Sequence, residues 1–115
     1  MKVTANIFDQ VVVLEVDGVV DAEHCSQLKK AIEKARGEGV KHFVLDLHKV
    51  GFIDSTGLGI LISLMRQQRE RDAELRLTGL QDEVRAIFEI TRLFRVFDIA
   101  PSVQAAVESL RQRSK

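Results

Sequence analysis

The sequence contains no tryptophan or tyrosine, a single cysteine and a single proline, and its charges cancel. One cysteine, Cys25, excludes a disulfide within the chain and is typical of a reducing compartment. The 17 basic and 17 acidic side chains leave no electrostatic footprint for direct binding of nucleic acid. The apolar runs are far shorter than the roughly 20 residues of a bilayer span, and Met1 leads directly into strand-like sequence without a signal peptide. We therefore expect a cytoplasmic protein without membrane insertion.

The 115 residues are enough for one domain, and their patterning predicts strands that alternate with helices. Strands are expected at residues 2–8, 11–16, 43–47, 75–77 and 94–97. Helices are expected to begin at Asp21, after Asp54, near Leu80 and at Pro101. The order β-β-α-β-α-β-α-β-α predicts an α/β fold with a mixed, mainly parallel sheet and about four helices. We expect the domain at residues 1–110 and a flexible basic tail at residues 111–115.

The spacing of apolar residues also predicts the buried face of each helix. The first two helices are expected to bury Cys25, Leu28, Ile32 and Ala35, then Leu58, Leu61, Ile62 and Met65. A third helix is suggested by Leu80, Val84, Ile87, Phe88 and Ile90, and the last helix is expected to have Val103, Ala106, Val107 and Leu110 on its inner face. Cys25 is therefore expected to be a small core residue.

The stretch from Val50 to Gly59 is expected to hold the functional site. It follows Phe43–Leu47, an apolar run typical of a strand that is buried on both faces. Residues 54–56, Asp-Ser-Thr, are types that cap the start of a helix. The two glycines that follow each cost roughly 1 kcal/mol relative to alanine in a helix, which suggests a need for bare backbone. The hydroxyl of Ser55 would stand at the positive end of a helix dipole, at the end of a central strand.

Enzyme and cofactor interpretations of this stretch are weak. Gly57-Leu58-Gly59 begins like a dinucleotide fingerprint, but Ile62 stands where a third glycine or alanine is needed. Ser55 as a nucleophile would need an oriented base. The three histidines are instead expected to be partly exposed surface residues or strand-end residues, and nothing obvious in the sequence orients His48. The histidines and the cysteine do not have metal-site spacing. We expect no catalysis, cofactor or metal, and a plain helix cap is the simplest alternative role for Ser55.

The segment from Phe43 to Gly59 carries a more specific signal. Its pattern, Phe-Val-Leu-Asp-Leu-(x)4-Phe-Ile-Asp-Ser-Thr-Gly-Leu-Gly, closely resembles the signature of STAS domains, in particular bacterial anti-sigma factor antagonists. Gly18–Asp21, Leu75–Leu80 and Val84–Phe97 resemble other segments of that family, so the resemblance covers nearly the whole chain. Thr56 is a common variant of a second serine in the signature.

The resemblance implies a switch at this site. In that family a serine kinase, which is also the anti-sigma factor, phosphorylates the serine after the aspartate, and a serine phosphatase reverses the reaction. Carried over to this chain, Ser55 is the phosphoacceptor, and Asp21 and Asp54 flank it on the surface that faces the kinase. The remaining partner-binding residues that the resemblance implies are Thr56, Gly57, Leu58 and Gly59.

The resemblance also implies a protein without catalysis, either a monomer or a weak homodimer. In the unphosphorylated form it would bind the anti-sigma factor and so release a sigma factor for transcription. Three alternatives are open at this point: a STAS subunit of a lipid-transport ATPase complex, a partner-switching regulator without a sigma factor, and a small enzyme that uses Ser55.

Overall fold

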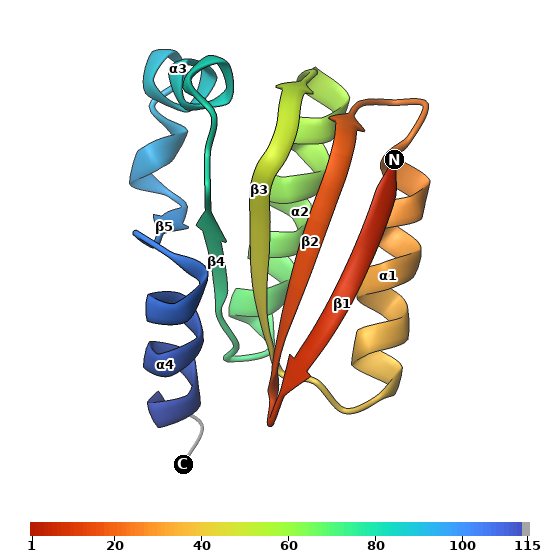
Figure 1. The fold of residues 1–115 in the computed structure, drawn as a ribbon, viewed down its shortest axis with the longest axis vertical. Helices are drawn as coiled ribbons and strands as arrows, with labels where there is room; N and C mark the ends of the chain where they lie inside the picture. The colour runs from red at the N-terminus through yellow and green to blue at the C-terminus, as the bar shows by residue number, and fades with distance from the viewer. Residues whose placement is uncertain (114–115) are drawn as a thin grey trace.

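A computed structural model describes residues 1–113 and confirms the predicted order of strands and helices (Figure 1). The strands are β1 (Lys2–Phe8), β2 (Val11–Val20), β3 (His42–Ile53), β4 (Leu75–Thr78) and β5 (Asp98–Ile99). The helices are α1 (Cys25–Gly37), α2 (Ser55–Glu70), α3 (Asp82–Ile90) and α4 (Val103–Arg113), and a 3₁₀ turn, η1, spans Leu93–Arg95. None of the helices among residues 1–113 is long and apolar enough to span a bilayer.

The five strands form one sheet in the order β1-β2-β3-β4-β5. β1 pairs with β2 in antiparallel orientation, and each later strand runs parallel to its neighbour, as the sequence predicts. The register places Leu14, Leu45 and Leu77 side by side on β2, β3 and β4, and each has 0% exposed surface. These leucines lie at the centre of the hydrophobic core.

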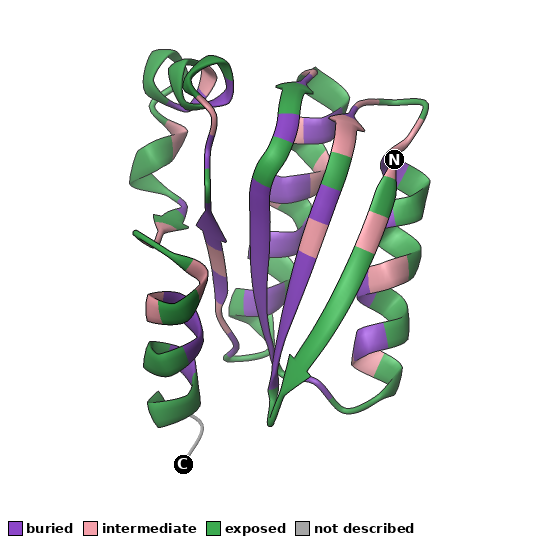
Figure 2. Ribbon diagram, viewed as in Figure 1, coloured by how far each residue is buried: buried purple, intermediate pink, exposed green. Residues whose placement is uncertain are grey.

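Helices cover both faces of the sheet. α1 and α2 lie side by side behind it in Figure 1, and α3 contributes to the same core through Phe88. α4 packs on the opposite face against Val44. Because β3 lies between these layers, residues 42–47 are all buried, which confirms the predicted doubly buried strand. In Figure 2 this buried stretch of β3 is purple, whereas β1, the edge strand on the far side of β2, is almost entirely exposed.

The predicted buried faces hold for α1 and for most of α4, and Cys25 is a core residue with 8% exposed surface. In α2 the buried face is rotated relative to the prediction, so that Leu58 and Ile62 are only half-buried. The positions that α2 buries are Gly57, Leu61, Leu64, Met65 and Gln68. α3 buries Val84 and Phe88, and Ile90, the last residue of the predicted helix, is 83% exposed.

Two predicted boundaries near the site are wrong. β2 does not end at residues 17 and 18 but continues to Val20, because β3 pairs with it as far as Ile53. Gly18 adopts a φ of 123° where the register is irregular, a conformation that favours glycine. α1 begins at Cys25 instead of Asp21, because the Asp21 carbonyl accepts hydrogen bonds from the N–H groups of residues 24 and 25 and forms a separate turn.

The predicted strand at 94–97 is also wrong. Arg92 adopts a left-handed φ of 60° after α3, and the chain then forms η1. Phe97 turns inward and packs edge-on against Phe88, with 5.5 Å between the ring centroids. The edge strand follows one residue later, as β5.

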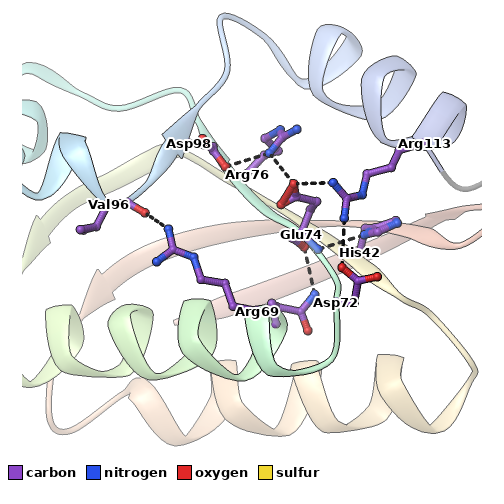
Figure 3. A network of polar contacts seen from close by, with 9 residues as sticks. His42, Arg69, Asp72, Glu74, Arg76, Val96, Asp98 and Arg113 are labelled. Atoms are coloured by element: carbon purple, nitrogen blue, oxygen red, sulfur yellow. Dashed lines mark hydrogen bonds and ion pairs between the residues drawn. The ribbon is translucent and has the colours of Figure 1, made fainter.

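The predicted boundary between the domain and a flexible tail, at residue 111, lies too early in the chain. Arg111 and Arg113 belong to α4, and both side chains form ion pairs with other parts of the chain. Arg111 pairs with Asp9 at 2.9 Å, and Arg113 pairs with Glu74 at 3.1 Å, as Figure 3 shows for the second pair. The rest of the expected tail, residues 114–115, lies outside the described residues.

Candidate functional site

The sheet brings the expected site residues together at the carboxyl ends of β2 and β3. Val20 and Ile53 are register partners, so the residues that follow them, Asp21 and Asp54, leave the sheet side by side. The N–H of Asp54 donates to the Val20 carbonyl at 3.2 Å, and the N–H of Ala22 donates to Asp54 Oδ2 at 3.3 Å. These hydrogen bonds join the turn before α1 to the start of α2.

Asp54 is the residue that caps α2. Its backbone is extended, and its Oδ1 accepts a hydrogen bond of 2.8 Å from the N–H of Gly57. This bond pairs one of the N–H groups that the first helical turn leaves free. Ser55 is therefore the first helical residue and not the cap. Its side chain and that of Thr56 are exposed, and within residues 1–113 neither makes a hydrogen bond.

The two glycines of the motif differ in what surrounds them. Gly57 is buried, and a Cβ atom there would overlap the carbonyl oxygen of Val20 and lie 3.0 Å from Ile53 Cγ2. The close packing of α2 on the end of β2 therefore requires glycine at this position. Gly59 is exposed, and a Cβ atom there would have nothing within 4 Å. The fold alone gives no reason for glycine at position 59, although it weakens the helix.

Asp21 is partly engaged within the chain. Its Oδ1 accepts a 2.9 Å hydrogen bond from the N–H of His24 and lies 2.7 Å from Nδ1 of the same residue. Partial desolvation raises the pKa of the Asp21 carboxyl, but these hydrogen bonds and the proximity of His24 outweigh it and lower the pKa below its usual value. The carboxyl group is therefore charged, and it lies beside the turn that carries Ser55.

The three histidines do not form a nucleophilic site with Ser55. His42 is a strand-end residue, the first of β3, and it is fully buried; its Nδ1 accepts a 3.0 Å hydrogen bond from the N–H of Glu74 (Figure 3). Burial, followed by the nearby charge of Lys41, lowers the pKa of His42. His24 and His48 are partly exposed as expected, but His48 is oriented after all, by Asp46 at 2.8 Å. Within residues 1–113 no imidazole is hydrogen-bonded to Ser55.

Two side-chain groups in the described part of the chain bring a histidine and two carboxylates within 4.8 Å of one another. They consist of Glu15, Asp46 and His48, and of Asp21, Glu23 and His24. In each group the histidine Nδ1 already lies against one carboxylate, and Glu15 also pairs with Lys49 at 2.9 Å. Pairing within the protein accounts for both groups.

Phe52 is a surface residue that sequence reasoning did not assign to the site. It is 51% exposed, two residues before Asp54, and its register partner is Val19. An aromatic residue of this exposure, so close in sequence to Asp54, adds apolar surface near the end of β3. The sequence indicates a role for Phe52 only through its place in the motif. Its exposure could not be predicted from alternation along the strand, because the pairing of β2 with β3 is irregular just before it.

Comparison with known proteins identifies the family of the chain. The model of the STAS domain matches residues 2–106. BtrV of Bordetella bronchiseptica is 31% identical over 111 residues, which is 96% of each chain. The anti-sigma-B factor antagonist of Listeria monocytogenes is 36% identical over 84 residues, which is 73% of this chain and 74% of the relative.

The anti-sigma factor antagonist SpoIIAA shares the fold. Its unphosphorylated form matches with a TM-score of 0.73 at 20% identity, over 96% of this chain and 98% of that chain. The phosphorylated form of SpoIIAA, from Bacillus, matches with a TM-score of 0.72 at 19% identity, over 94% and 98%. The family model, the curated relatives and the fold thus agree with one family. The chain belongs to the STAS domain family, among the anti-sigma factor antagonists, which are regulatory binding proteins and not enzymes.

Proposed function

We propose that this chain is a cytoplasmic anti-sigma factor antagonist controlled by phosphorylation of Ser55. The observation that carries the proposal is the state of Ser55: an exposed hydroxyl at the first position of α2, without a hydrogen bond to residues 1–113. A hydroxyl that the fold does not use is free to enter the active site of a kinase. Gly59, one turn further along α2, leaves space for a partner's backbone to approach.

The surface around Ser55 suits binding by a protein partner. It combines the exposed ring of Phe52 and the half-buried Leu58 with the carboxylates of Asp21 and Asp54. Apolar anchors surrounded by charged groups are common at protein interfaces. In the proposed mechanism the unphosphorylated surface binds an anti-sigma factor that is also a serine kinase, and a sigma factor is released as a result.

Phosphorylation would change this surface and not the core. A phosphate adds roughly −1.5 to −2 charges at neutral pH. The start of α2 tolerates an anion, because the helix dipole places partial positive charge there, whereas Asp54 and Asp21 repel it. Against the partner the same group adds bulk, desolvation cost and repulsion from acidic side chains. Binding is therefore lost until a phosphatase removes the phosphate.

Intact mass spectrometry after incubation with a candidate kinase and ATP tests the proposal. We expect one added phosphate on the wild type and on the matched control Ser63→Ala, whose serine is also exposed on α2. We expect none on Ser55→Ala. If Ser55→Ala were phosphorylated as much as the wild type, the phosphorylated residue would be a different one, and Thr56→Ala would be the next variant to measure. Co-purification with a transporter ATPase, and no phosphorylation by any kinase, would favour the lipid-transport alternative.

A further inference from the structure

A second feature lies at the opposite end of α2 from Ser55. There the carboxyl-terminal ends of α1 and α2 and the segment before β3 enclose an open pocket of about 320 Å³. Since α2 has 16 residues at a rise of about 1.5 Å each, roughly 24 Å of helix separates this pocket from the proposed switch. A molecule bound there would not cover Ser55.

All ionisable groups that line the pocket are cations. Arg36, Lys41 and Arg71 contribute positive charge, and the other walls come from Val40, Ala73 and the side chain of Gln68. Within residues 1–113 none of the three cations forms an ion pair with a carboxylate. The protein as a whole is neutral, so this local surplus of charge is a specific feature of the pocket.

The Arg36 guanidinium is held in place by neutral groups. Its Nη1 donates to Gln67 Oε1 at 2.9 Å, its Nη2 donates to Gln68 Oε1 at 3.1 Å, and it lies 5.6 Å from the centre of the Phe43 ring. Gln68 is itself fixed, with 1% exposed surface and an Nε2 that donates to the carbonyls of Lys41 and Glu74 at 2.9 Å each. The guanidinium is thus oriented without an ion pair to a carboxylate in the described part of the chain.

The charges of the pocket repel one another. Burial lowers the pKa of Arg36, and the nearby charge of Arg71 lowers it further, whereas Glu33 opposes the shift from outside the pocket. An anion between these side chains would relieve the repulsion and accept hydrogen bonds from the remaining Nη–H groups of Arg36. The pocket volume is near the lower end of the range of roughly 300–1,000 Å³ for ligand sites, which fits a small molecule.

We propose that this pocket binds a small phosphate-bearing molecule with at least two negative charges, through Arg36, Lys41 and Arg71. Both a soluble phosphate ester and the phosphate of a lipid headgroup have this chemistry. The site is separate from the partner surface around Ser55, so ligand and protein partner are able to bind at the same time.

Backbone amide NMR of the full chain with inorganic pyrophosphate as the probe tests this proposal. We expect saturable shifts at residues 39–41 and 71–73 and none at residues 54–59. Lys41→Ala and Arg71→Ala should each weaken binding about tenfold, because each removes one charge-assisted contact. The matched controls Lys30→Ala and Arg66→Ala remove exposed cations of α1 and α2 that do not line the pocket, and they should leave affinity unchanged.

Sedimentation with vesicles of phosphatidylcholine that contain phosphatidic acid distinguishes the two sources of phosphate. If the wild type binds these vesicles and Lys41→Ala and Arg71→Ala do not, the ligand is a lipid headgroup. If the wild type is saturated by pyrophosphate but does not bind the vesicles, the ligand is a soluble phosphate ester. The proposal is overturned if neither probe binds, or if the control variants weaken binding as much as the pocket variants. Ser55→Ala should bind the probe like the wild type, so the result does not depend on the proposed switch.

Discussion

The two glycines at the start of α2 give a matched pair of substitutions with opposite expected effects on stability. At Gly57 a Cβ atom would overlap the Val20 carbonyl oxygen, which is backbone and cannot rotate away. Forced overpacking of this kind typically costs about 1–3 kcal/mol. At Gly59 a Cβ atom meets nothing within 4 Å, so alanine should stabilise the helix by up to about 1 kcal/mol. We therefore expect Gly57→Ala to be less stable than the wild type and Gly59→Ala to be slightly more stable.

Urea and thermal unfolding of the two purified variants measure this difference. For a domain of this size a change of 1 kcal/mol moves the melting temperature by roughly 4 °C, so the effects should be resolved. If Gly57→Ala were as stable as the wild type, α2 would not pack on the end of β2 as described. If Gly59→Ala lowered stability, the fold itself would require glycine at position 59, and the description of its open surroundings would be wrong. Under the proposed function, titration calorimetry should show that Gly59→Ala loses partner affinity in spite of its higher stability.

Three further predictions concern the site and the core. Asp21→Asn should weaken partner binding in calorimetry with little change in melting temperature, and a large fall in melting temperature with unchanged affinity would assign Asp21 to local structure instead. Phosphorylation of Ser55 should leave stability within about 1 kcal/mol, because the helix dipole and Asp54 act in opposite directions. On phosphorylation the NMR chemical shifts of backbone amides should change only near residues 54–59 and 21. Changes of equal size in α4 would indicate a conformational change of the whole domain. Since burial lowers the pKa of His42 in the folded state, the unfolded chain takes up a proton first as pH falls below about 6.5. Urea unfolding should therefore show stability falling by up to about 1.4 kcal/mol per pH unit there, and His42→Gln should remove this dependence, whereas an unchanged slope would contradict it.

Local patterns in the sequence were sufficient for the architecture, and they bring the candidate site residues to one end of the sheet. These patterns are the apolar run of β3, the cap residues that follow it and the apolar periodicity of the helices. Each of them is formed by residues that are close together in the sequence. The segment at 94–97 was assigned wrongly because its apolar residues fit a strand, whereas the left-handed backbone of Arg92 and the packing of Phe97 on Phe88 depend on distant structure.

The finer features of the site depend on contacts that the sequence does not reveal. Asp54 and Ser55 are both residue types that cap helices, and which of them is the cap depends on where α2 begins in the folded chain. Gly57 and Gly59 are equivalent in the sequence, and the Val20 carbonyl distinguishes them. The sequence left open whether His42 is a surface residue or a strand-end residue, because its buried partner, the N–H of Glu74, lies on another segment of the chain.

The carboxylate of Asp54 links two segments that together would meet a partner. One oxygen accepts from Gly57 in α2, and the other accepts from Ala22 in the turn after β2. The two halves of the surface are therefore ordered relative to each other before any encounter. A partner would dock on a rigid face, and little conformational entropy would be lost in this chain on association. The heat-capacity change of binding should accordingly follow the apolar area buried at the interface, without the larger contribution that folding of a disordered segment would add.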